Sequence, residues 1–325
     1  MMTLNRALLI GGVAISGLTS TASFAEKWHM PTPYGDGNLP TQIAYTFAQE
    51  IKENTKGELD ITVHSGGSLV KHTEIPRSVK TGQVQMGEVF LGILGNENPV
   101  YKHDNIPFLA TSFEDAKKLW EAAKPAVSKQ LDKDGMMLLY AVAWPAQSLY
   151  SKDPVNSLAD LKGQKMRAYS PSTSRLADLM GTTPTTIQVP DIPQAFSTGI
   201  IQAMITSPST GVDSQAWDYV NNYTDVKAWI PKNIIVVNKR AFRRLDKATQ
   251  QVILDAAKHA EAAGWTKVAA RAAKDKATLI ENGMVVSEPS PQLLKELQAI
   301  GKTMTEEWKA EAPKEVGEIL TRYQN

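Results

Sequence analysis

Apolar and polar residues follow two kinds of repeat in the first half of the chain. Residues 59–64 alternate apolar and polar side chains, the period of two that is typical of a half-buried strand. Between 43 and 51 apolar residues recur every four positions, which places them on one face of a helix. A short strand is expected at 26–31, and the continuously apolar run 136–144 is typical of a strand covered on both faces.

Strands and helices are expected to alternate along the following segments as well. Ser112 is a suitable N-cap for a long helix, and Asp115 is favourably placed near its positive end. The elements that the pattern indicates are helices over 73–81 and 112–133 and strands near 84–90, 147–152, 165–169, 184–188 and 203–206. Such alternation predicts an α/β fold with parallel sheets.

Two long helical patterns close the chain. The pattern from Asp246 to Asn282 is almost unbroken and ends at Gly283. At the rise of an α-helix this segment is about 50 Å long. A helix confined to one compact lobe would be shorter, so we expect this helix to span two lobes. A second, amphipathic helix is expected from about Pro291 to the C-terminus.

The N-terminal segment has the three parts of a secretory signal peptide. Arg6 is followed by a mainly apolar stretch at 7–18 and then by small residues. Ser23 and Ala25 stand three and one positions before the expected cleavage site. We therefore expect residues 1–25 to be removed and the protein to be periplasmic. A retained membrane anchor is the alternative, but the apolar core is shorter than the ~20 residues that span a bilayer.

Charge and composition narrow the possible functions. The chain has 35 basic and 34 acidic residues and no cysteine. This balance argues against a nucleic-acid partner, and the absence of cysteine excludes disulfides, zinc–thiolate sites and thiol nucleophiles. Because Arg6 lies in the expected signal peptide, the mature chain would carry 34 groups of each sign. Any preference for anions must then come from a few placed groups.

The chain lacks the common local signatures of catalysis. It contains no G-x-x-x-x-G-K-[ST] phosphate loop, no G-x-S-x-G nucleophile motif and no H-x-x-x-H zinc spacing. We therefore expect no enzymatic activity, no metal site and no cofactor. An exported α/β hydrolase is the alternative, because residues that are distant in sequence can converge in space.

Six short segments carry a resemblance when they are taken in chain order. They are GGSL at 66–69, GQVQMGEV at 82–89, IPFL at 106–109, SLADLKGQKMRAYSPS at 157–172, AFSTGIIQAMITSPS at 195–209 and IIVVNKRAFRRLDKATQQVILDAA at 234–257. No single segment is specific. The ordered set resembles the extracytoplasmic solute-binding proteins of TRAP transporters, of the dicarboxylate-binding (DctP) type, over essentially the whole mature chain.

The resemblance implies a two-lobed periplasmic-binding-protein-like fold with a hinge, in which the long helix spans both lobes. Lobe I would comprise 26–146 and 233–272, and lobe II 147–232 and 273–325. The implied function is capture of an organic acid between the lobes and its delivery to the small and large membrane subunits of the transporter. We expect a monomer; a swapped dimer and a sensing role, in which the ligand is presented to a receptor, stay open.

Arg167 is the first candidate for ligand binding. The resemblance places it at the ligand arginine of the family, at the end of the expected strand 165–169. Strand ends are where open α/β sheets bind ligands. A guanidinium group donates two parallel hydrogen bonds to a carboxylate. The alternative is a surface arginine in an ordinary ion pair.

A polar residue is expected next to this arginine. The resemblance places it after the run 199–203, at Thr206 or Ser207, where the family often has Asn. Ser207 could instead be only the N-cap of the next helix. Many family members carry a second arginine, but its position here holds Ala146, with Gln147 next. A second fixed positive charge is therefore missing at that point.

Aromatic side chains are expected to form much of the remaining pocket. Phe90 lies near a position that is often Ser or Glu in the family, and Glu88 lies two residues earlier on the same strand face. Trp144 and Tyr34 are further candidates, each with a core position as the alternative. An aromatic pocket with one cation predicts a monocarboxylate with an apolar or aromatic tail, or a small 2-oxo or 2-hydroxy acid. A C4-dicarboxylate is the alternative ligand.

Overall fold

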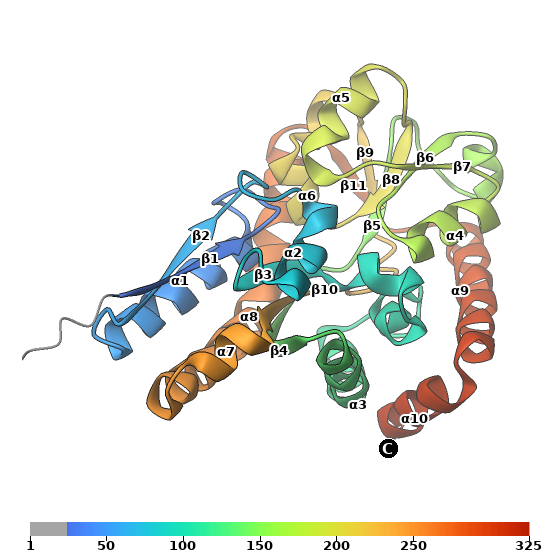
Figure 1. Cartoon of the computed structure of the whole chain (residues 1–325). Helices are drawn as coiled ribbons and strands as arrows, with labels where there is room; N and C mark the ends of the chain where they lie inside the picture. The colour runs from blue at the N-terminus through green and yellow to red at the C-terminus, as the bar shows by residue number, and fades with distance from the viewer. Residues whose placement is uncertain (1–24, 325) are drawn as a thin grey trace, which may run out of the picture.

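The computed structural model describes residues 25–324, so the expected signal peptide, apart from Ala25, lies outside the described residues. The described chain forms two lobes, drawn one above the other in Figure 1, each with its own β-strands and hydrophobic core. The expected two-lobed α/β fold is therefore confirmed. Within the described part of the chain, no helix combines the length and apolar character needed to cross a bilayer.

Lobe I is built on two small sheets with helices packed around them. Its elements are the strands β1 (Glu26–Pro31), β2 (Leu59–His64), β3 (Met86–Phe90), β4 (Met136–Ala143) and β10 (Lys232–Asn238) and the helices α1 (Leu39–Asn54), α2 (Ile75–Thr81), α3 (Phe113–Lys133) and α7 (Lys239–Arg244). β1 pairs with β2, and β10 lies between β3 and β4. Ser112 caps α3 as expected, because its hydroxyl accepts a 3.0 Å hydrogen bond from the Asp115 N–H.

Lobe II contains one six-stranded sheet in the order β11-β9-β5-β8-β6-β7. Its elements are the strands β5 (Ser148–Ser151), β6 (Lys165–Ala168), β7 (Thr183–Thr186), β8 (Ala203–Thr206), β9 (Asn222–Thr224) and β11 (Val285–Ser287) and the helices α4 (Pro171–Leu179), α5 (Ile192–Ser197) and α6 (Pro208–Asp213). The pattern of apolar residues indicated β5 to β8 but not the three-residue strands β9 and β11.

The expectation of purely parallel sheets is wrong for two strands. β10 runs antiparallel to β3 and β4, and β5 runs antiparallel to β8 and β9. The pairs β1–β2, β6–β7, β6–β8 and β9–β11 are parallel. β5 and β10 are the strands with which the chain enters one lobe from the other. They join their sheets without the helical crossover that a parallel neighbour needs.

The two segments that connect the lobes are paired with each other. The Trp144 N–H donates to the Pro231 carbonyl at 2.9 Å, and the Gln147 N–H donates to the Trp229 carbonyl at 2.9 Å. The Ala228 N–H donates back to the Gln147 carbonyl at 2.8 Å. The two crossing segments, 144–147 and 228–231, therefore form one short ladder between the lobes.

The long helix predicted from the sequence is α8 (Lys247–Glu281). Asp246 caps it by accepting hydrogen bonds from the backbone N–H groups of Ala248 and Thr249. Ile253 in its first half belongs to the core of lobe I, whereas Leu279 near its end belongs to a core cluster of lobe II. The helix therefore spans both lobes, as its length implied.

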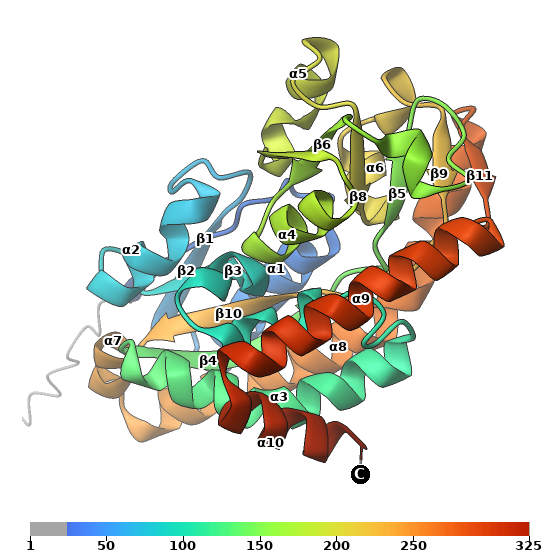
Figure 2. The same ribbon diagram turned by 90° about the vertical axis from the view of Figure 1, so that its right-hand side faces the viewer.

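The expectation of one continuous helix after Pro291 is wrong. The chain forms α9 (Pro291–Glu311) and α10 (Pro313–Gln324), because Pro313 has no N–H to continue the first helix and restricts the residue before it. In Figure 2 α9 runs past both lobes and α10 turns along α3. Val316 and Ile319 belong to the core of lobe I, so α10 packs on that lobe although the expected range 273–325 assigns it to lobe II.

Arg271 on α8 connects the lobes at a point outside the paired crossings. Its Nη1 donates to the Gly37 carbonyl of lobe I at 2.8 Å, and its Nε lies 2.7 Å from Oδ2 of Asp275. The Asp275 carboxylate also accepts a hydrogen bond from the Ser209 hydroxyl on α6 of lobe II. One guanidinium thus joins lobe I, the long helix and lobe II.

The Arg271→Ala substitution is expected to lower the free energy of unfolding by about 3 kcal/mol, because the buried Asp275 would lose its charged partner. Urea denaturation followed by circular dichroism measures this loss. Arg175→Ala is the matched control, since its ion pair with Glu307 is exposed and should contribute little. Equal unfolding midpoints for the two variants would show that the contacts of Arg271 with Gly37 and Asp275 do not stabilise the fold.

Candidate functional site

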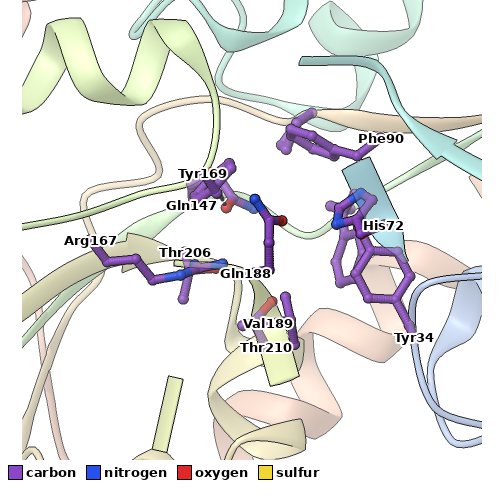
Figure 3. A pocket seen from close by; sticks show the side chains of 12 residues that line it. Tyr34, His72, Phe90, Gln147, Arg167, Tyr169, Gln188, Val189, Thr206 and Thr210 are labelled. Atoms are coloured by element: carbon purple, nitrogen blue, oxygen red, sulfur yellow. Dashed lines mark hydrogen bonds between the residues drawn. The ribbon is translucent and has the colours of Figure 1, made fainter. Parts of the chain in front are cut away.

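A cavity lies between the lobes beside the paired crossings, and Figure 3 shows its walls. The cavity is narrow, and the empty space inside it, with the open mouth included, is about 340 Å³. Lobe I contributes Tyr34, His72, Phe90 and Trp144, the crossings contribute Gln147 and Pro231, and lobe II contributes Arg167, Tyr169, Gln188, Val189, Thr206 and Thr210. The site is therefore completed only when both lobes are together.

The lobe II wall forms where three parallel strands end. β6 pairs in parallel with β7 on one side and with β8 on the other. Tyr169 follows β6, Gln188 follows β7 and Thr206 is the last residue of β8. Because the carboxyl ends of parallel strands meet at one edge of the sheet, these three side chains converge on the cavity.

Arg167 lies at the centre of this wall and is only 3% exposed. Its Nε donates to the Ile187 carbonyl at 3.0 Å, its Nη1 lies 3.5 Å from the Thr206 hydroxyl, and its guanidinium stands 4.7 Å from the centre of the Tyr169 ring. Burial lowers the pKa of Arg167 to about 10, which still leaves the group charged at neutral pH.

This buried cation has no anionic partner among the residues that the structure describes. Among residues 25–324, no Asp or Glu forms an ion pair with Arg167. A buried charge without a counter-ion is costly. The carbonyl and hydroxyl oxygens around it satisfy only part of its five donors. The geometry therefore suits an anion supplied from outside.

Gln147 and Tyr169 close the cavity at the crossings. The Tyr169 hydroxyl donates to Oε1 of Gln147 at 2.9 Å, while Nε2 of Gln147 donates to the Pro145 carbonyl at 2.9 Å. Both side chains are therefore held in fixed orientations beside Arg167. Gln147 stands next to Ala146, so a neutral amide lines the cavity at the point where the resemblance had implied that a second arginine is missing.

The lobe I wall is aromatic. The Tyr34 ring meets the Trp144 ring edge-on with centroids 4.9 Å apart, and Phe90 meets Tyr169 of lobe II edge-on at 5.5 Å. Figure 3 shows Tyr34, His72 and Phe90 facing Arg167 and Thr206 across the cavity. The site therefore has an aromatic side on lobe I and a polar, singly charged side on lobe II.

His72 is the polar exception on the aromatic wall. Its ring nitrogens are buried, and neither has a hydrogen-bond partner among the described residues. Burial lowers the pKa of His72 to about 4; the neighbouring Gln188 side chain acts in the opposite direction, and the positive charge of Arg167 in the same direction as burial. At neutral pH the ring is therefore uncharged, with one nitrogen able to donate a hydrogen bond and the other able to accept one.

Six of the eight expected site residues line the cavity: Tyr34, Phe90, Trp144, Gln147, Arg167 and Thr206. Ser207 does not, because its hydroxyl caps α6 by accepting from the Thr210 N–H at 3.0 Å. Glu88 does not either, because it lies behind the aromatic wall and is hydrogen-bonded to Asn233. Among residues 25–324 no three His, Asp or Glu side chains gather as metal ligands would.

Sequence reasoning missed His72, Tyr169, Gln188, Val189 and Thr210. Tyr169 and Gln188 end the strands that were expected at 165–169 and 184–188, so the rule that ligands bind at strand ends could have found them. Thr210 lies one turn after Thr206 at the start of α6. His72 belongs to a single 3₁₀ turn, η1 (His72–Glu74), and no local pattern marks it.

Known proteins resemble the chain closely. The family model of the bacterial extracellular solute-binding proteins, family 7 (DctP), matches residues 34–312. The structure of DctP7, a Bordetella pertussis extracytoplasmic solute receptor binding pyroglutamic acid, is 49% identical, covers 93% of this chain and 100% of its own, and superposes with a TM-score of 0.92. A marine metagenome TRAP solute-binding protein specific for pyroglutamate is 39% identical, with 92% and 99% coverage and a TM-score of 0.91.

A curated relative agrees with these structures. A solute-binding protein of Albidiferax ferrireducens is 24% identical over 259 residues, which cover 75% of this chain and 76% of the relative. The members of this group are receptors for transport and not enzymes. Because the family model and the solved structures match nearly the whole described chain, the chain belongs to the family 7 extracellular solute-binding proteins, the receptors of TRAP transporters.

Proposed function

We propose that this TRAP receptor captures a small cyclic monocarboxylate, with pyroglutamate as the leading candidate. The observation that carries the proposal is the buried Arg167, which lacks an anionic partner among the described residues. A ligand carboxylate would supply that partner and accept hydrogen bonds from the guanidinium and from the Thr206 hydroxyl. The proposal is supported by the relatives with 49% and 39% identity that bind pyroglutamate.

The lobe I wall supports a ring rather than a chain of hydroxyl groups. Tyr34, Phe90 and Trp144 offer flat apolar surfaces on which a five-membered ring can pack. His72 and Gln188 are the polar groups left for the amide edge of a lactam, since the nitrogens of His72 have no partner in the described chain. A sugar acid would bring several hydroxyls against aromatic carbon, where they would lose their hydrogen bonds.

A C4-dicarboxylate is not favoured. Arg167 is the one charged side chain among the described residues that line the cavity, if His72 is neutral. A second ligand carboxylate would be buried without a cation, which costs several kcal/mol.

We also propose the finer points of location and assembly. The chain would be exported to the periplasm with cleavage after Ala25, supported by the apolar stretch and small residues before it. The mature protein would act as a monomer and deliver its ligand to the small and large membrane subunits of the transporter.

Pyroglutamate is expected to stabilise the purified protein more than any C4-dicarboxylate. At a concentration of about 100 Kd the gain in unfolding free energy is about 2.7 kcal/mol, which a thermal-shift panel detects. The panel also contains succinate, which has a second carboxylate. Proline and cyclopentanecarboxylate keep a five-membered ring and one carboxylate but lack the lactam amide. Strongest stabilisation by succinate would refute the proposal.

Arg167→Ala is expected to weaken pyroglutamate binding by at least about a hundredfold, because a buried charged hydrogen-bond partner is removed. Calorimetric titration measures the affinity. The unliganded variant should be no less stable than the wild type, since the lost charge has no counter-ion in the free protein. Arg175→Ala, on an exposed face, serves as the control. Unchanged affinity in Arg167→Ala would show that another group binds the carboxylate.

His72→Phe is expected to remove much of the preference for the lactam and leave the carboxylate site intact. The wild type should bind pyroglutamate more tightly than cyclopentanecarboxylate, and in the variant this ratio should fall by roughly tenfold, the value of one hydrogen bond. Phenylalanine keeps the aromatic packing against Tyr34. An equal loss of affinity for both acids would assign His72 a purely structural role.

A further inference from the structure

Glu88 is a fully buried carboxyl group behind the aromatic wall of the cavity. Its Oε1 accepts a 2.5 Å hydrogen bond from Nδ2 of Asn233, and its Oε2 has no partner among the described residues. Asn233 pairs with Phe90 across β10 and β3, and Glu88 lies two residues from Phe90 on the same face of the strand. Glu88 therefore lies within the sheet that carries the wall.

The orientation of the Asn233 amide is set by its other neighbour. Nε1 of Trp144 donates to Oδ1 of Asn233 at 2.8 Å. An indole N–H can only donate, so the Asn233 oxygen must face Trp144 and its NH₂ group must face Glu88. The hydrogen bonds thus run in one direction, from Trp144 through Asn233 to Glu88.

The surroundings of Glu88 disfavour its charged form. Two buried tyrosines, Tyr34 from the loop before α1 and Tyr140 from β4, lie near enough to interact with its charge. Burial, and then the charge of Glu88, raises the pKa of both well above its usual value. Asn233 is the one hydrogen-bond donor that the described chain gives to its carboxyl group. Burial raises the pKa of Glu88 to about 8, although the Asn233 hydrogen bond acts in the opposite direction.

We propose that Glu88 is a positioning residue for ligand binding, which holds the Asn233 amide, and through it the Trp144 ring, in the orientation that the cavity requires. This inference rests on the proposed function, because it assumes that the ligand ring packs on Trp144. Ionised Glu88 would place a negative charge behind that surface, where it needs further donors and repels the ligand carboxylate. Ligand affinity should therefore fall as the pH rises through the pKa of Glu88.

Calorimetric titration of pyroglutamate at pH 7 and pH 9 tests this role. The wild type is expected to bind roughly tenfold more weakly at pH 9, because only about a tenth of the molecules would keep Glu88 protonated. Glu88→Gln keeps the neutral acceptor for Asn233, so it should retain the affinity at pH 7 and lose the pH dependence. Glu88→Leu removes the acceptor and should bind roughly tenfold more weakly at both pH values. The same pH dependence in wild type and Glu88→Gln would overturn the proposal.

A second readout needs no ligand and so separates this proposal from the identity of the ligand. The indole N–H resonance of Trp144, assigned by its loss in Trp144→Phe, reports the hydrogen bond to Asn233 directly. In the free wild-type protein it should shift with a midpoint near pH 8, and in Glu88→Gln it should stay constant. A resonance that does not move in the wild type would refute the coupling, whereas a titrating resonance with no pyroglutamate binding would refute only the proposed ligand.

Discussion

The buried Arg167 is the feature on which the site depends. Its guanidinium is held by the Ile187 carbonyl, lies near the Thr206 hydroxyl and stacks on Tyr169, so the protein itself fixes its position. None of these groups is an anion, and a cation in such surroundings pays a desolvation cost that only an external negative charge can offset. In the proposed function the same residue therefore provides the affinity for a carboxylate and the reason why the two lobes gain from closing over one.

The short helix α6 links the wall of the cavity to the contacts between the two lobes. Thr210 at the start of α6 lines the cavity, and Asp213 at the end of α6 accepts a 2.6 Å hydrogen bond from Nδ2 of Asn38 in lobe I. Arg271 joins the same region to the Gly37 carbonyl. A ligand that orders α6 from the cavity side therefore also orders the contacts that hold the lobes together, while the paired crossings near Gln147 keep the lobes aligned.

The sequence predicted most of the elements because their burial pattern is local. The alternation in 59–64 and the unbroken helical pattern from Asp246 to Asn282 need no knowledge of the rest of the fold. The direction of β10 and β5 was not predictable in this way, because it depends on which lobe the chain enters. Arg167 came from the family resemblance and not from its spacing. His72 could not be found, since long-range packing alone brings the turn η1 to the cavity.

Charge balance inside the cavity supports the proposed class of ligand. Arg167 contributes one positive charge, while burial keeps His72 and Glu88 neutral at neutral pH. A monocarboxylate brings the closed site to zero net charge, whereas a dicarboxylate would leave one buried negative charge unpaired. An ionised Glu88 would neutralise Arg167 from behind and remove the advantage of binding any acid. In this proposal the receptor distinguishes ligand classes by one placed cation and by a buried acid that stays protonated at neutral pH, in a mature chain whose expected formal charges cancel.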